Sequence, residues 1–262
     1  MRDTMKKSVY KNYIFDLYGT LVDIQTDEMS MKLWKRLARM YEVYGAVYKP
    51  KQLRKAFWKP DQEERKKTRK ELGCEYPECQ LEKVFLRLLR DDSVVGQAGS
   101  SILTMTPEQE MIWAEFMANS FRILSRKYIR LFPNTIQTLE RLKQCGCRIY
   151  MLSNAQAVFT RPEIRVLGLE PYFDAVYLSS DYGRMKPDPV FLRTLMEDKR
   201  LKREDTVMVG NEIESDMRIA DSCGIEGILI DTGKKGKKEL NRQAANLGIR
   251  QLPEIIRDIG EL

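Results

Sequence analysis

Histidine is absent from the 262 residues of this sequence. Its absence excludes Ser-His-Asp and Cys-His catalysis, histidine general bases and the usual transition-metal sites. Any chemistry must therefore use carboxylates, lysine, tyrosine or hydroxyl side chains. An accompanying ion would be one that prefers oxygen ligands, such as Mg²⁺.

Cysteine is scarce, with five in the chain. An odd number without regular spacing does not indicate a disulfide framework, and the pair Cys145 and Cys147 is too small for a structural zinc site, which has four ligands. We interpret the five cysteines as reduced, partly buried thiols of a cytosolic protein.

Long hydrophobic runs are also missing. No stretch approaches the roughly 18 apolar residues that cross a membrane. The opening Met-Arg-Asp-Thr-Met-Lys-Lys leads towards the first expected strand without the apolar region of a signal peptide. We therefore expect a cytoplasmic protein with no membrane partner.

The charge balance does not favour nucleic acid as a partner. The formal net charge is +7, but 32% of the residues are charged and the two signs are interspersed, as in residues 61–71. Such a pattern is typical of a solvated helix face. The most basic segment, residues 233–238, is expected in a surface loop.

Four apolar runs along the chain each end in polar residues. Asp16 ends Asn-Tyr-Ile-Phe-Asp, and Ser153 and Asn154 follow Arg-Ile-Tyr-Met-Leu. Lys186 lies in Gly-Arg-Met-Lys-Pro-Asp-Pro, after the run Ala-Val-Tyr-Leu-Ser, and residues 211–216 follow Thr-Val-Met-Val-Gly. If the runs are parallel strands, their carboxyl ends bring these polar groups to one edge of the sheet. A carboxylate nucleophile, a hydroxyl and an ammonium group there suit a small anionic substrate.

The rest of the chain predicts an α/β fold with an inserted helical region. Between residues 24 and 128 the apolar spacing is helical and no convincing strand occurs, and Thr106-Pro-Glu-Gln109 is a capping box that opens a helix. From residue 129 strand and helix patterns alternate, with helices expected at 162–167 and 216–223 among others. This alternation predicts a Rossmann-like parallel sheet with helices on both faces.

The four segments, in this order, resemble the motifs of the haloacid dehalogenase-like hydrolase superfamily. The resemblance implies a discontinuous core of residues 1–23 and 129–262 and an all-helical cap of residues 24–128, joined by hinges near 23–27 and 126–131. It also implies that Asp16 attacks the substrate and forms a covalent aspartyl intermediate that water hydrolyses. Lys186 would supply positive charge, and Ser153, Asn154, Thr20 and Tyr18 would bind the substrate. Thr20 would also help to shape the turn that presents Asp16.

Phosphatases of this family bind Mg²⁺ through the nucleophile, a carbonyl two residues later and a residue of the fourth motif. The resemblance implies that the same positions would bind Mg²⁺ in this chain. These positions are Asp16, Tyr18 and Asn211 here. Asp216 would lie behind them, near Lys186 or a metal-bound water, and Glu212 is an alternative acidic group.

Two positions depart from the phosphatase pattern and leave alternatives open. Tyr18 stands where many members carry an acid–base Asp, and Asn211 stands where an acidic ligand is common. We expect a Mg²⁺-dependent phosphatase, a monomer or homodimer, that acts on a small phosphomonoester. The alternatives are a metal-independent 2-haloacid dehalogenase, which the Asp-x-Tyr-Gly-Thr run resembles, and an inactive protein that binds a phosphorylated ligand.

Overall fold

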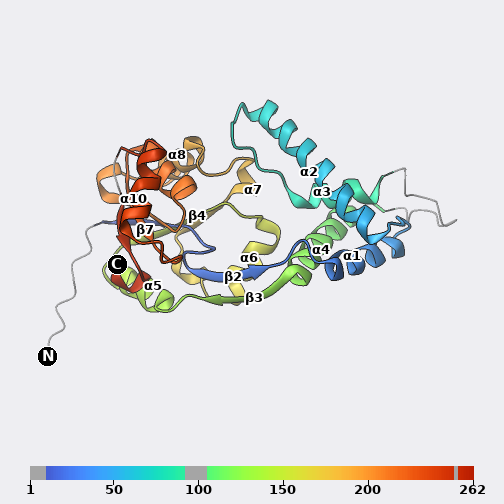
Figure 1. Cartoon of the computed structure of the whole chain (residues 1–262), viewed down its shortest axis with the longest axis horizontal. Coiled ribbons are helices and arrows are strands. Elements are labelled where there is room, and N and C mark those ends of the chain that lie inside the picture. The colour runs from blue at the N-terminus through green and yellow to red at the C-terminus, as the bar shows by residue number, and fades with distance from the viewer. Residues whose placement is uncertain (1–9, 92–104, 251–252) are drawn as a thin grey trace. The chain divides into compact units, whose positions relative to one another are not determined.

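The computed structural model describes residues 10–91, 105–250 and 253–262, which form two compact units (Figure 1). The first unit comprises Met1–Asp23, Arg130–Ala155 and Glu163–Leu262, and the second comprises Ile24–Ile129 and Gln156–Pro162. No described helix combines the length and the apolar character needed to cross a membrane.

The first unit contains a parallel sheet. Its six described strands have the order β5-β4-β1-β6-β7-β8. Their bounds are β1 Asn12–Phe15, β4 Arg148–Ser153, β5 Ala175–Leu178, β6 Thr206–Gly210, β7 Glu226–Ile230 and β8 Glu254–Ile256. The central strands β1 and β6 are buried along their whole length, which is why their sequences are continuously apolar after the first residue rather than alternating.

Helices cover this sheet on both faces, as the alternation of patterns predicts. Helices α8 and α10 lie on one side of the strands and α5 on the other (Figure 1). On the first side, Ile14 and Leu152 of the sheet share a core with Phe191 and Leu195. The helices that follow the strands are α5 Thr135–Gln144, α6 Ala157–Val166, α7 Ser179–Tyr182, α8 Pro189–Asp198, α9 Arg218–Cys223 and α10 Lys237–Asn246.

The second unit is helical. Its four described long helices are α1 Met31–Val43, α2 Pro50–Leu72, α3 Leu81–Leu89 and α4 Pro107–Ser125. An aromatic core joins them, in which Phe57 stacks on Phe121 and contacts Phe85. The capping box at the start of α4 is confirmed. The backbone N–H of Gln109 donates to the Thr106 hydroxyl, and the backbone N–H of Thr106 donates to the side-chain oxygen of Gln109.

The expected hinges near 23–27 and 126–131 are strands. Residues Val22–Thr26 form β2 and Arg126–Leu131 form β3, and the two pair in a sheet of their own. The prediction that residues 24–128 contain no strand was therefore wrong at both ends of that range. Whether these strands act as hinges stays a prediction.

Helix α6 begins at Ala157, not at Pro162 as the sequence predicts. A proline inside a helix lacks the N–H that would bond the carbonyl four residues earlier. Here that carbonyl belongs to Val158, and it accepts a hydrogen bond from the Asn119 side chain of α4 at 3.3 Å. The helix continues through the proline because a neighbouring helix satisfies the orphaned group.

The helix expected at 216–223 is also divided. Residues Ile213–Met217 form a π-helical turn, and α9 runs from Arg218 to Cys223. Turns of this kind occur often at functional sites. This one contains Asp216, whose side chain bonds the backbone of the preceding loop.

Candidate active site

Asp16 follows the central strand β1 at the carboxyl edge of the sheet. Its amide donates to the Val209 carbonyl of β6 at 2.9 Å, so the neighbouring strand fixes its backbone. The chain then turns tightly: the amides of Thr20, Leu21 and Val22 all reach the Leu17 carbonyl. Asp16 is only 7% exposed, and its neighbours therefore determine its electrostatics.

Lys186 is the main charged neighbour of Asp16. Its Nζ lies 2.7 Å from Asp16 Oδ1 and 2.6 Å from Asp216 Oδ1, and the lysine is 3% exposed. Burial alone would lower the pKa of Lys186, but the carboxylates of Asp16 and Asp216 outweigh it, so the pKa is raised and the ammonium form is favoured. One buried ammonium group thus forms ion pairs with two carboxylates.

The second predicted segment, Ser153 and Asn154, bonds Asp16 through one residue and Lys186 through the other. Ser153 ends β4, and its hydroxyl donates to Asp16 Oδ1 at 3.0 Å. The Asn154 side chain instead bonds the Lys186 backbone twice: its Nδ2 donates to the carbonyl at 3.0 Å, and its Oδ1 accepts from the amide at 2.7 Å. Asn154, expected to bind substrate, thereby holds the loop that carries Lys186.

Asp216 organises the loop after β6. Its Oδ2 accepts from the amides of Asn211 and Glu212 at 3.1 and 3.0 Å, while Oδ1 binds Lys186. Complete burial raises the pKa of Asp216, although the Lys186 ammonium acts in the opposite direction. Both oxygens are therefore engaged within the protein, and Asp216 acts as a structural partner of the lysine and the loop.

Gly210 makes room for Asp216. A β-carbon at position 210 would lie 2.2 Å from Asp216 Oδ2, far inside contact distance. We expect Gly210→Ala to destabilise the protein by about 1–3 kcal/mol, a typical overpacking cost, and to remove activity by shifting Asp216 and Lys186. Gly233→Ala is the control, because its nearest neighbour would be 3.8 Å away. Equal unfolding midpoints and activities of the two variants would contradict this account.

Thr20 links Asp16 to Asn211. Its Oγ1 lies 3.3 Å from Asp16 Oδ2 and 3.1 Å from Asn211 Oδ1. The Asn211 side chain rests against Gly19, where a β-carbon would come within 2.5 Å of the amide nitrogen. Gly19 also has φ 87°, a left-handed conformation that favours glycine. The turn is thus shaped to let Asn211 approach Asp16.

Tyr18 and Glu212 have partners outside this cluster. The Tyr18 hydroxyl donates to Oε2 of Glu163, a buried residue of α6. Glu212 is exposed, and its Oε2 accepts from the Ser215 hydroxyl at 2.8 Å. The sequence did not indicate Glu163, because nothing about a single glutamate in a helix predicts that its side chain bonds a residue that follows β1.

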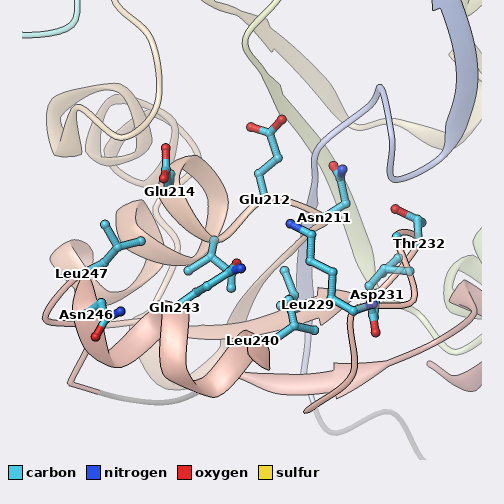
Figure 2. Close-up of a pocket in the computed structure, with 14 residues that line it drawn as sticks. Asn211, Glu212, Glu214, Leu229, Asp231, Thr232, Leu240, Gln243, Asn246 and Leu247 are labelled. Carbon is cyan, nitrogen blue, oxygen red and sulfur yellow. Dashed lines mark hydrogen bonds between the residues drawn. The ribbon is translucent and has the colours of Figure 1, made fainter. Parts of the chain in front are cut away.

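Asn211 also lines a cavity. It has a volume of about 570 Å³ and lies between the loop after β6, the loop after β7 and helix α10 (Figure 2). Leu229 and Leu240 contribute apolar surface, and Glu212 and Asp231 contribute carboxylates. Both oxygens of Asp231 accept backbone amides, those of Lys235 and Gly236.

The oxygen donors beside Asp16 suit Mg²⁺. Among the described residues, no three or more histidine, cysteine, aspartate or glutamate side chains cluster to hold a metal ion. Thr20 nevertheless brings together one carboxylate oxygen of Asp16 and the amide oxygen of Asn211. Both are hard donors, and Mg²⁺ commonly binds proteins through one or two carboxylates while it keeps several waters. The donor set fits the ion with few protein ligands.

Comparison with known proteins shows similarity to one family of hydrolases and to two named phosphatases. The sequence profile of the haloacid dehalogenase-like hydrolases matches residues 13–230. A glyceraldehyde 3-phosphate phosphatase from Methanocaldococcus jannaschii is 29% identical over 128 residues, 49% of this chain and 56% of that protein. A phosphoglycolate phosphatase from Vibrio vulnificus is 27% identical over 137 residues, 51% of this chain and 60% of that protein. The chain thus spans little more than half the length of these relatives.

Among solved structures, a 2-haloacid dehalogenase from Pseudomonas syringae has the same fold. It superposes with a TM-score of 0.65 at 20% identity and covers 96% of each chain. The profile match extends over most of the sequence, from β1 to β7, and includes all four polar segments at the edge of the sheet. The chain belongs to the haloacid dehalogenase-like hydrolase family.

Proposed function

We propose that this protein is a phosphatase that hydrolyses a small phosphomonoester, with Asp16 as the nucleophile. The observation that carries the proposal is the single buried carboxylate at the end of β1, which is bonded to Lys186 and Ser153 at 2.7 and 3.0 Å. The similarity to named phosphatases supports phosphate as the group transferred.

The reaction has two steps. In the first, an Asp16 oxygen bonds to phosphorus and the bond to the leaving oxygen breaks, which leaves an aspartyl phosphate. In the second, water bonds to phosphorus and the bond to Asp16 breaks. The Lys186 ammonium offsets repulsion between the carboxylate and the phosphoryl group, and the hydroxyls of Ser153 and Thr20 can donate to phosphoryl oxygens.

Asp16, the Tyr18 carbonyl and Asn211 would hold Mg²⁺. When bound, the ion offsets negative charge on the phosphoryl oxygens. Asp216 does not join this set, because Lys186 and two backbone amides occupy its oxygens. Its role is to keep Lys186 and the Asn211 loop in position.

The helical unit would act as a cap that determines which substrates bind. The range expected for the cap is 24–128, and the second unit comprises Ile24–Ile129 and Gln156–Pro162. Gln156 bonds the helical unit twice: its Nε2 donates to the Cys79 carbonyl at 2.9 Å, and its Oε1 accepts from the Leu81 amide at 3.0 Å. Cap movement would therefore act on the chain three residues beyond Ser153.

Dehalogenation is the second candidate, and Tyr18 is the residue that favours it. A 2-haloacid dehalogenase expels halide and needs no acid at that position. The discriminating experiment assays purified protein, with and without Mg²⁺, on sugar phosphates, nucleotides, p-nitrophenyl phosphate and 2-chloropropionate. Mg²⁺-dependent phosphate release supports our proposal, metal-independent chloride release supports dehalogenation, and ligand binding without product indicates an inactive binding protein.

Asn211 offers a direct test of the metal assignment. In Asn211→Asp a second carboxylate would join Asp16, and we expect Mg²⁺ to bind more tightly and to activate at a lower concentration. Calorimetric titration of Mg²⁺ measures the change without relying on turnover. Asn246→Asp, an exposed position on α10, controls for the added charge. Unchanged or weaker binding in Asn211→Asp would remove Asn211 from the ligand set.

A further inference from the structure

Helix α4 of the helical unit is apolar on two opposite sides. Its inward side is buried in the aromatic core, where it contributes Met117 and Phe121. Its outward side carries Ile112, Phe116 and Ile123, which are 61%, 51% and 60% exposed. A helix that is apolar all round is normally buried all round, because exposed apolar surface is unfavourable in water. The outward side of α4 is therefore a surface that a partner would cover.

The three exposed residues of α4 share one face. Each residue turns the helix by about 100°, so positions 112, 116 and 123 lie within roughly 40° of one another around its axis. Helix α1 of the same unit differs, because its exposed side includes Lys35 and Arg36, as expected of a helix that faces water. Exposed apolar groups that gather on one face are typical of sites of protein–protein contact.

We propose that the outward side of α4 is the surface through which two copies of this chain form a dimer, with their α4 helices antiparallel about a two-fold axis. In such an interface the same patch serves both subunits, so that residue i meets residue j and residue j meets residue i. Ile112 and Ile123 are equally far along the helix from the point between Met117 and Ala118. An axis at that point places each Ile112 opposite Ile123 of the partner subunit, with the two copies of Phe116 close to the axis.

The charges at the two ends of α4 favour the antiparallel arrangement. Glu108 lies in the first turn of the helix, and Lys127, the second residue of β3, lies just beyond its end. Both are exposed, and neither forms a hydrogen bond or an ion pair in the part of the chain that the structure describes. They are also equally far from the proposed axis, so each Glu108 would approach Lys127 of the partner subunit. A parallel pair would instead bring like charges together at both ends.

Sedimentation velocity of the full chain, at concentrations that span the micromolar range, tests the proposal. One pair of helices is a small interface, so we expect a weak dimer whose mass rises from 30.7 kDa towards twice that value as the concentration increases. Phe116→Glu should raise the dissociation constant at least about 100-fold, because two carboxylates would then be buried near the axis. Val166→Glu is the control: it adds the same charge at an exposed apolar position of α6, and should dimerise like the wild type.

Exchange of the two charges tests the antiparallel arrangement. Glu108→Lys and Lys127→Glu should each weaken the dimer about fivefold, because like charges would then meet at both ends of the interface. The double variant Glu108→Lys/Lys127→Glu restores opposite charges and should dimerise nearly as well as the wild type. Both positions are exposed, so these variants decide the question even if Phe116→Glu does not fold. Thermal unfolding monitors the fold of each variant.

A wild-type protein that stays monomeric at every concentration would overturn the proposal, as it would if another segment or another protein covers α4. A dimer that Phe116→Glu leaves intact would also overturn it, because the contact would then lie elsewhere. A double variant as weak as the single ones would contradict the antiparallel arrangement. Since none of these measurements depends on turnover, their outcome leaves the proposed function to its own tests.

Discussion

Asp16→Asn is expected to abolish turnover and leave the fold intact. An amide cannot form the acyl phosphate, so activity should fall by several orders of magnitude. The substitution preserves the shape of the side chain and leaves Lys186 paired with Asp216 at 2.6 Å, so the buried charge cluster keeps a partner for its cation. Steady-state assays on the best substrate of the panel measure the loss, and thermal unfolding monitors the fold.

The matched control for this substitution is Asp205→Asn. Asp205 directly precedes β6, at the edge of the sheet opposite to Asp16, and pairs with Lys11 near the surface. Its replacement should leave activity unchanged. Retention of more than about a tenth of wild-type activity in Asp16→Asn would exclude Asp16 as the nucleophile.

Lys186→Met is expected to affect both stability and activity. The substitution leaves the carboxylates of Asp16 and Asp216 buried without their shared cation. Loss of one partner from a buried ion pair typically costs about 3–5 kcal/mol of unfolding free energy. Denaturant titration measures that loss. Activity should also disappear, because Lys186 is the only lysine that bonds Asp16 in the part of the chain that the structure describes.

A second substitution separates the two effects of Lys186→Met. Adding Asp216→Asn removes one of the uncompensated charges and should restore part of the unfolding free energy, while activity stays absent. The amide oxygen of the new residue can still accept from the Asn211 and Glu212 amides. If Lys186→Met alone unfolds at the wild-type denaturant concentration, the lysine does not stabilise the buried carboxylates.

The meeting of Asp16, Ser153, Lys186 and Asp216 followed from the sequence. Each residue comes at or after the end of an apolar run, and parallel strands place such ends at one edge of the sheet. The measured contacts, Ser153 and Lys186 to Asp16 and Lys186 to Asp216, agree with that expectation. Their roles in catalysis stay predictions for the experiments above.

Side-chain direction was harder to predict than position. Asn154 stands beside Ser153 in the sequence, yet its amide holds the Lys186 backbone. Its direction depends on the loop opposite, which lies more than thirty residues away in the chain. The sequence predicted that α6 begins at Pro162 for a similar reason. Pro162 has no N–H to bond the Val158 carbonyl, and the group that bonds it instead is the Asn119 side chain of another helix.

By itself the sequence determined the α/β class, the parallel sheet, the helical insertion and the set of polar residues at the strand ends. It could do so because hydrophobic periodicity and strand direction are local properties of the chain. Only the tertiary structure decided that Asn154 holds the Lys186 backbone, that Asn211 rests against Gly19 and that Tyr18 bonds Glu163. These contacts join segments far apart in sequence, and their hydrogen bonds and charge pairs form only once packing has brought the partners within a few ångströms.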